Sequence, residues 1–248
     1  MPLSGAPRFS PKPGPQARAR NPLRPRGGDG NSVRFFWTQI AVALSLALVL
    51  SFGFAGLDYH NLALFSSGAS AWYPAATFED SIPYLPTWIW VYLAYYPLCF
   101  APLAIRRLRT DRETFWRVVG AYLFQFGAGF LMFWLIPSRM IRPGPAGGHW
   151  TALAVSLTFQ ADPGFNIFPS MHVCNLVYTA GLFRRYSGKV SSLFMGCAAA
   201  LVSLSTLFVK QHCAVDVLAG AFLGTLAFFL FHSNSPVASP PGESQPGQ

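Results

Sequence analysis

Charged side chains are scarce in this chain, and acidic ones are scarcer than basic ones. Only 11% of the 248 residues are Asp, Glu, Lys or Arg, whereas 52% are hydrophobic and the mean hydropathy is +0.35. A soluble globular protein carries about 25% charged residues. The composition therefore argues against an ordinary soluble domain and predicts an integral membrane protein, whose length suits one compact helical domain.

Cysteine is also sparse, and its spacing fits neither a metal site nor a disulfide framework. Each cysteine lies within or at the edge of an apolar segment, where a free thiol behaves as a small apolar residue. The four are Cys99, Cys174, Cys197 and Cys213. No Gly-x-Ser-x-Gly sequence is present either, which removes the serine nucleophile typical of α/β-hydrolases.

Six apolar stretches lie between two polar ends of the chain. Most approach the ~20 residues that a helix needs to cross a bilayer, and unpaired backbone groups are too costly in lipid for other structures. The fold class predicted is all-α: a polytopic membrane protein with six transmembrane helices in one bundle. The six stretches are residues 35–57, 85–105, 115–136, 168–184, 190–209 and 213–231.

Three regions follow from this pattern. Residues 1–33 are rich in Pro, Gly and Arg, and residues 233–248 are rich in Ser, Pro and Gly; both are expected to be disordered tails, the first of them basic. Residues 34–232 form the expected membrane domain. A signal peptide cleaved at Ala69-Ser70-Ala71 is the alternative for the first stretch, but the basic segment before it is too long and the small residues lie too far beyond the apolar run.

The basic residues are distributed unevenly around these stretches. Six spans place both tails on one side, and that side then holds 15 of the 18 lysines and arginines. The positive-inside rule makes this side cytoplasmic. The net charge of +9 then reflects orientation and attraction to anionic lipid headgroups, so nucleic acid is not an expected partner. The 15 residues are Arg8, Lys12, Arg18, Arg20, Arg24, Arg26, Arg34, Arg106, Arg107, Arg109, Arg112, Arg117, Arg184, Arg185 and Lys189.

Two histidines and an aspartate are expected on the opposite face, at the edges of apolar segments. His172 begins the fourth stretch, and His212 and Asp216 begin the sixth. Ionisable groups at the edge of a bilayer are costly and usually mark a functional site. His212 and Asp216 are four residues apart, so on a helix the carboxylate can accept a hydrogen bond from the imidazole. That bond would leave the other ring nitrogen free for chemistry.

The surrounding residues suit phosphoryl transfer. Arg142 offers a forked pair of donors that matches phosphate, and Arg139 and Lys210 add positive charge. A helix that begins at Pro169 would present free N–H groups and the Ser170 hydroxyl to an anion. Phosphoryl transfer needs such positive charge around the phosphate, together with an in-line nucleophile.

We expect His212 to be the nucleophile that forms a phosphohistidine, with Asp216 as its orienting partner. His172 would protonate the leaving alcohol and then activate water or an acceptor alcohol. Protein cations neutralise the phosphate in this scheme, so it requires no metal or other cofactor. Zinc binding by the three residues is an alternative that the neighbouring cations disfavour.

Three ordered motifs carry a family resemblance: Arg142-Pro143, Pro169-Ser170-x-His172, and Ser205 followed by His212-x3-Asp216. Together they resemble the three motifs of the type 2 phosphatidic acid phosphatase superfamily, which are Lys-x6-Arg-Pro, Pro-Ser-x-His and Ser-Arg-x5-His-x3-Asp. The resemblance implies the same six-helix layout. It also implies His212 as nucleophile, Asp216 as its partner, His172 as acid and base, and Arg142 and Ser170 as phosphate ligands.

The sequence departs from these motifs at two cationic positions. Leu135 stands where the first motif has Lys, and Thr206 stands where the third motif has Arg. Arg139 and Lys210 are the candidates to replace the missing cations. Ser205 is either a phosphate ligand or a residue whose hydroxyl bonds its own helix backbone.

The run 168–173 and the string Lys210-Gln211-His212 are more similar to the branch that holds inositol phosphorylceramide synthases and sphingomyelin synthases. We therefore expect a membrane phosphatase or phosphotransferase that acts on a lipid-linked phosphate at the non-cytoplasmic face. Transfer of a phospho-headgroup to a lipid alcohol is the alternative reaction. A membrane protein that binds lipid phosphates without turnover is the alternative of another class.

The expected partners are a membrane lipid substrate and the bilayer itself, in a bacterial inner membrane or a eukaryotic endomembrane. The sequence specifies no oligomeric state. Gly220 and Gly224, spaced as Gly-x3-Gly, predict a close contact between two helices.

Overall fold

The computed structural model describes residues 29–68 and 79–233, and within these ranges the regular elements are helices and one isolated β-bridge between Arg139 and Phe165, joined by turns and loops. The predicted all-α class is confirmed. The elements are α1 (Asp29–Ser66), η1 (Pro86–Trp88), α3 (Ile89–Leu93), α4 (Tyr95–Leu98), η2 (Ala101–Ala104), α5 (Arg106–Thr110), α6 (Arg112–Leu135), α7 (His149–Ala161), α8 (Met171–Tyr186), α9 (Lys189–Phe208) and α10 (Ala214–His232).

The two expected tails lie mostly outside the described residues, as does the alternative cleavage site Ala69-Ser70-Ala71. Residues 29–33 were expected to be disordered, but α1 already begins at Asp29. The chain from Asn31 to Phe36 carries no proline, so nothing in it prevents the apolar helix from extending toward its N-terminus.

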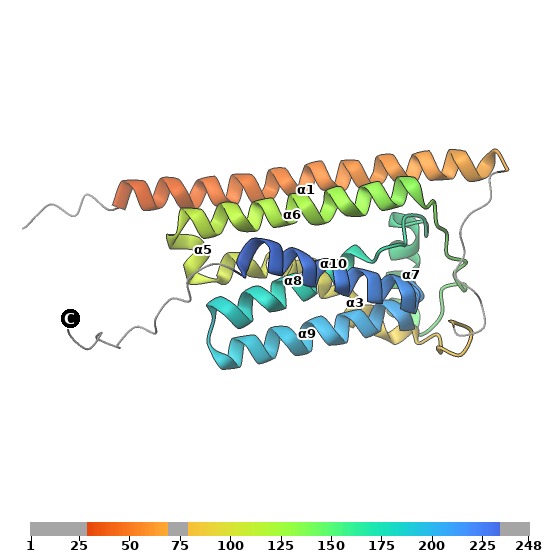
Figure 1. Ribbon diagram of the computed structural model, residues 1–248. Coiled ribbons are helices and arrows are strands. Elements are labelled where there is room, and N and C mark those ends of the chain that lie inside the picture. Colours follow the sequence, from red (N-terminus) through yellow and green to blue (C-terminus); the bar gives the residue numbers. More distant parts are fainter. Residues whose placement is uncertain (1–28, 69–78, 234–248) are drawn as a thin grey trace, which may run out of the picture.

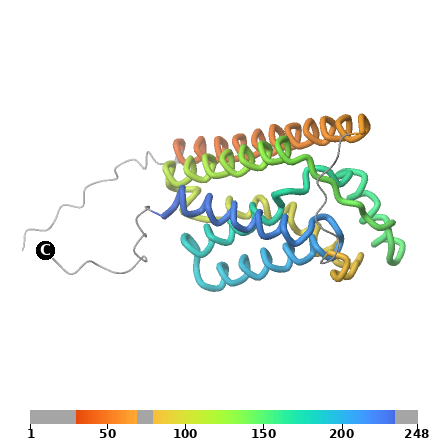
Figure 2. The backbone as a smooth tube through the Cα atoms, turned by 45° about the vertical axis from the view of Figure 1, so that its right-hand side comes forward, coloured from red at the N-terminus to blue at the C-terminus, as the bar shows by residue number. Residues whose placement is uncertain are grey.

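The long helices run side by side as a bundle (Figure 1). Helix α10 packs between α8 and α6, α9 packs on α8, and α1 packs on α6 at the outer edge. The rotated view in Figure 2 shows the same side-by-side arrangement. Helix α7 lies across the end of the bundle where α6 ends and α10 begins (Figure 1).

Four of the six expected spans are helices long and apolar enough to cross a membrane. They are Gly30–Ser66, Arg112–Leu135, Lys189–Phe208 and Ala214–His232. The structure therefore supports an integral membrane protein with four candidate spans among the described residues.

The other two stretches have a different form. Residues 85–105 are divided into η1, α3, α4 and η2, because Pro97 and Pro102 lack the N–H that a continuous helix needs. The stretch at 168–184 forms α8, which has 16 residues and buries polar Asn175 and Thr179 among its neighbours. Both segments pack inside the bundle, where they line the site described below.

Helices α8 and α10 cross with their backbones in close contact. A Cβ atom added to Gly220 would lie 2.3 Å from the carbonyl oxygen of Ser170, and one added to Gly224 would lie 2.3 Å from that of Cys174. The backbone N–H of Ser170 also donates to the carbonyl of Asp216 at 3.0 Å. The close contact expected from the two glycines is confirmed, and it fixes the start of α8 against the start of α10.

Gly220→Ala should separate these two helices, because the added methyl group meets backbone and cannot be accommodated by a side-chain rotation. Overpacking of this kind costs about 1–3 kcal/mol. We expect a lower thermal unfolding midpoint in detergent. Gly127→Ala on α6 is the matched control, since nothing lies within 4 Å of its added Cβ. Equal midpoints for the two variants would contradict this description of the helix contact.

Candidate functional site

The two histidines of the expected site lie in direct contact. Nδ1 of His172 and Nε2 of His212 are 3.0 Å apart, and the ring centroids are 5.2 Å apart. His172 lies in the first turn of α8, whereas His212 lies in the turn that joins α9 to α10. His212 is buried and His172 is half-buried. The fold therefore brings together two imidazoles that are 40 residues apart in the sequence.

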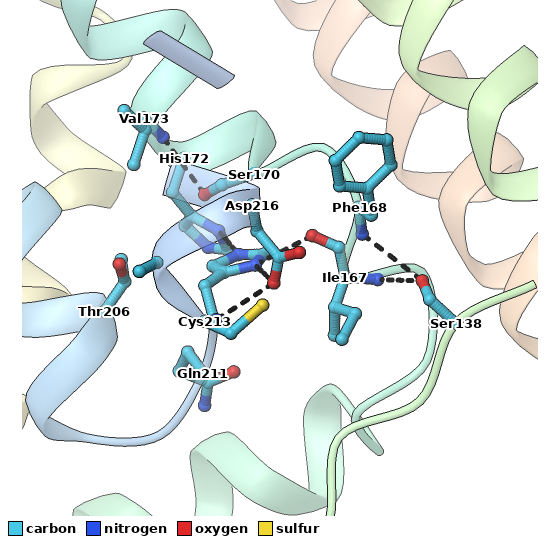
Figure 3. Close-up of polar contacts among 12 residues, drawn as sticks. Ser138, Ile167, Phe168, Ser170, His172, Val173, Thr206, Gln211, Cys213 and Asp216 are labelled. Atoms are coloured by element: carbon cyan, nitrogen blue, oxygen red, sulfur yellow. Dashed lines mark hydrogen bonds and ion pairs between the residues drawn. The ribbon is translucent and has the colours of Figure 1, made fainter. Parts of the chain in front are cut away.

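Asp216 lies beside His212, but its geometry differs from the expected helical pairing. The helix begins only at Ala214, so His212 and Asp216 do not share a helix face. The distance from His212 Nδ1 to Asp216 Oδ2 is 3.5 Å, longer than an ordinary N–H···O hydrogen bond. Nδ1 of His212 is instead 3.0 Å from the carbonyl oxygen of Ile167 (Figure 3).

The carboxylate of Asp216 caps the start of α10. Oδ2 accepts a hydrogen bond from the backbone N–H of Cys213 at 3.0 Å, as a capping box requires. The side chain is fully buried, and Oδ1 has no hydrogen-bond partner within the described part of the chain. The carboxylate thus lies close enough to His212 to stabilise positive charge on its ring.

Backbone contacts hold His212 in place. The carbonyl of Thr206 accepts from the N–H groups of Gln211 and His212, at 2.9 and 3.1 Å. On the other side, the hydroxyl of buried Ser138 accepts from the N–H groups of Ile167 and Phe168, at 3.2 and 3.3 Å (Figure 3). Ser138 therefore places the Ile167 carbonyl that the His212 ring meets.

Ser170 is the N-cap of α8. Its hydroxyl accepts from the N–H of Val173 at 3.4 Å, and its backbone N–H donates to the backbone carbonyl of Asp216. The side chain is fully buried next to the histidines (Figure 3). The expected anion-binding end of α8 therefore begins at Met171, because the N–H of Ser170 is already paired.

Arg142 contacts Gln211, the residue that precedes His212. Its guanidinium Nη2 donates to Gln211 Oε1 at 2.5 Å and to Asp162 Oδ1 at 3.3 Å, and Nη1 donates to the Asp162 carbonyl. The guanidinium also lies over the Phe159 ring, 5.0 Å from its centroid. The side chain is only 7% exposed, so this positive charge is held inside the protein, in contact with the residue that precedes His212.

The remaining three predicted phosphate ligands make other contacts. The ammonium of Lys210 donates to the carbonyls of Glu79 and Ile82, at 3.0 and 2.6 Å. Arg139 is exposed, with its guanidinium 5.6 Å from the Phe165 centroid. The hydroxyl of Ser205 donates to the Val202 carbonyl of its own helix at 2.6 Å. None of the contacts in the described ranges joins these side chains to the histidines.

Two aromatic residues of α3 and α4 contact His172 and were missed by sequence reasoning. The Tyr92 hydroxyl is 2.8 Å from Nε2 of His172, and the Tyr95 ring centroid is 4.4 Å from that of His172. Asn175 donates to the Tyr95 hydroxyl at 2.8 Å. Tyrosine hydroxyls within an apolar stretch need hydrogen-bond partners when the stretch packs against protein, and this is the signal that could have found the two residues.

A second polar group joins α1 to the loop before α8. Asn166 donates to Asp58 Oδ1 at 2.7 Å and accepts from Asn61 Nδ2 at 2.6 Å. Asn166 adopts a left-handed conformation with φ 56°, which asparagine tolerates better than most residues. This loop continues directly into Ile167, so α1 helps to fix the carbonyl that His212 meets.

Comparison with known proteins gives one result that bears on this site. Residues 140–238 match the PAP2 superfamily. The matched region covers α7 to α10 and includes Arg142, Ser170, His172, His212 and Asp216. No curated protein and no solved structure matches the chain. The comparisons thus give no support for the inositol phosphorylceramide and sphingomyelin synthase branch.

Ser138→Ala should destabilise the protein, because the buried N–H of Ile167 would lose the hydroxyl that accepts from it, and the N–H of half-buried Phe168 would lose the same contact. A buried donor left unpaired costs about 1–3 kcal/mol. The readout is the thermal unfolding midpoint in detergent. Ser203→Ala is the matched control, since that hydroxyl donates to the Ala199 carbonyl of its own helix and supports no loop among the described residues. A midpoint for Ser138→Ala as high as that of the control would show that this hydroxyl does not support the loop.

Proposed function

We propose that this protein is a metal-independent membrane phosphatase or phosphotransferase that acts on a lipid-linked phosphate through a phosphohistidine at His212. The contact between His172 and His212, inside the region that matches the PAP2 superfamily, is the observation that supports this function best. Two imidazoles in contact can serve as nucleophile and proton carrier at one phosphorus atom.

His212 has the protonation pattern that a nucleophile needs. The carbonyl of Ile167 can only accept a hydrogen bond, so Nδ1 of His212 carries the proton. Nε2, which faces His172, then holds the lone pair. When a phosphorus atom bonds to Nε2 the ring becomes positive, and the buried carboxylate of Asp216 stabilises that charge.

His172 would handle the protons of both steps. An incoming phosphoryl group takes the place of the hydrogen bond between the two rings. As the Nε2–P bond forms and the P–O bond breaks, a protonated His172 gives its Nδ1 proton to the leaving oxygen. In the second step Nδ1 takes a proton from water or from an acceptor alcohol, and the N–P bond breaks.

Charge stabilisation of the phosphate would come chiefly from Arg142, whose buried guanidinium contacts Gln211, the residue that precedes His212. Ser170 and the N–H groups at the start of α8 add donors near the same point. The contacts of Arg139, Lys210 and Ser205 give no support to a ligand role for these three residues, so we leave them out of the proposed phosphate site.

The position of the site in the bundle supports an active site on the non-cytoplasmic side. The arginine-rich α5, the beginning of α1 and the turn between α8 and α9 lie at one end of the bundle, whereas the beginnings of α8 and α10 lie toward the other end (Figure 1). Clustered arginines favour the cytoplasmic side. A lipid in the opposite leaflet would present its phosphate to the histidines while its chains remain in the bilayer.

Purified protein in lipid vesicles should release phosphate from at least one member of a panel of lipid phosphates, and EDTA should not abolish this activity. His212→Ala should reduce the rate to background, and His172→Ala should lower it by about 10²–10⁴, the usual contribution of a general acid or base. His149→Ala is the control, since this exposed residue on α7 lies outside the site.

The same panel distinguishes the alternatives when lipid phosphodiesters and a lipid alcohol are included. A new phospholipid that forms only with the alcohol present, together with little free phosphate, would identify headgroup transfer through the same intermediate. Saturable binding of lipid phosphates by a protein that neither hydrolyses nor transfers them would rule out the enzyme and favour a binding protein.

A further inference from the structure

Tyr92 holds the side of His172 that faces away from the reacting atoms. This residue of α3 is 1% exposed, and its hydroxyl is 2.8 Å from Nε2 of His172. Nδ1 of the same ring faces His212 at 3.0 Å. Both nitrogens of His172 therefore have a defined partner: Nδ1 faces His212 in the site, and Nε2 faces Tyr92 of α3.

Tyr92, His172, His212 and the Ile167 carbonyl form a series of hydrogen bonds. The carbonyl at its end determines the direction of each bond. The Ile167 carbonyl cannot donate, so Nδ1 of His212 donates to it and Nε2 of His212 accepts. In the neutral pair, His172 must then donate from Nδ1, which leaves its Nε2 to accept from the Tyr92 hydroxyl. Each proton in this arrangement lies on one donor and faces one acceptor.

We propose that Tyr92 is a positioning residue that keeps Nδ1 of His172 as the nitrogen that exchanges protons with the substrate. This proposal rests on the phosphoryl-transfer function proposed above. A hydroxyl suits the task because it can both donate and accept, so it pairs with Nε2 in either protonation state of the ring. Phenylalanine at this position would fill the same space but would leave Nε2 without a partner.

The reaction can be followed proton by proton. The substrate complex begins with His172 protonated at both nitrogens, the second proton arriving with a phosphate monoester monoanion or from water. Nε2–H now donates to the Tyr92 oxygen, and the Tyr92 hydroxyl proton rotates away from His172 toward the neighbouring Tyr96, whose ring centroid lies 6.4 Å from that of Tyr92. Tyr96 is 51% exposed, so its own hydroxyl can pair with solvent or headgroups.

The first step then consumes only the Nδ1 proton. The N–P bond to His212 forms, the P–O bond breaks and the leaving oxygen takes that proton, while Nε2 keeps its own proton on Tyr92. Neutral His172 is left with a lone pair on Nδ1, which is the form that can take a proton from water in the second step. Without Tyr92, the Nε2–H group would be unpaired in a buried site, which disfavours the protonated ring.

The experiment compares two leaving groups with Tyr92→Phe. Expulsion of the alkoxide from phosphatidic acid needs the proton of His172, whereas expulsion of nitrophenolate from 4-nitrophenyl phosphate does not. The value of kcat/KM reports the first step for both substrates in mixed micelles. Since general acid catalysis contributes about 10²–10⁴, we expect a loss of about 10–100-fold with phosphatidic acid and about threefold or less with the aryl ester.

Tyr95→Phe is the matched control, because it also removes the hydroxyl of a tyrosine that packs on the His172 ring, but one that pairs with Asn175. Its loss should be the same for both substrates. In a His172→Ala background, Tyr92→Phe should cause no further loss with phosphatidic acid, which tests the role even if the single variant is somewhat less stable.

Three outcomes are distinguishable. A selective loss with phosphatidic acid that disappears in the His172→Ala background supports the proposal. An equal loss with both substrates, or a full additional loss without His172, would overturn the role of Tyr92 while leaving the phosphatase intact. A wild-type protein that turns over no member of the panel of lipid phosphates and phosphodiesters, and no aryl ester, would refute the proposed function itself.

Discussion

The site depends on the close crossing of α8 and α10. Gly220 and Gly224 allow the backbone of α10 to approach the carbonyls of Ser170 and Cys174 more closely than any side chain would permit. The hydrogen bond from Ser170 to the Asp216 carbonyl joins the same two helix ends. His172 lies two residues after Ser170, and His212 lies four residues before Asp216. The packing of the two backbones therefore sets the distance between the imidazoles.

The rest of the site consists of loops fixed to this crossing by buried hydrogen bonds. His212 lies outside any helix and is held by the carbonyls of Thr206 and Ile167. The Ile167 carbonyl is placed by Ser138, and Asn166 links the same loop to Asp58 and Asn61 of α1. Polar residues are costly in an apolar helix unless they are paired. Their pairing explains why α1, which packs mainly on α6, carries these two side chains.

The sequence was sufficient for the features that depend on periodicity, composition and spacing. Long apolar runs predicted the all-α class and six spans, of which four are helices long and apolar enough to cross a membrane, and the Gly-x3-Gly spacing predicted the tight helix pair. The position of His172 and His212 at the beginnings of two apolar segments predicted that they would lie at one level of the bundle. These predictions hold because each follows from a local pattern and the cost of exposing backbone to lipid.

Other features depend on tertiary contacts that a local pattern does not contain. The run 85–105 has the composition of a span, but its prolines divide it, and Tyr92 becomes a partner of His172 only when α3 packs inside the bundle. Asp216 has the spacing of a helical partner, yet the turn before α10 makes it a helix cap. Lys210 adopts φ 56° at the end of α9, which directs its ammonium to two loop carbonyls.

The central claim is that Nε2 of His212 bonds to phosphorus during turnover. The most direct measurement is rapid quenching of the protein with a ³²P-labelled lipid phosphate, followed by peptide mapping and mass spectrometry under alkaline conditions. The account predicts an acid-labile, alkali-stable phosphoryl group on the peptide that contains His212, present in the wild type and absent in His212→Ala. A label on another residue, or rapid turnover in a His212→Ala protein, would contradict it.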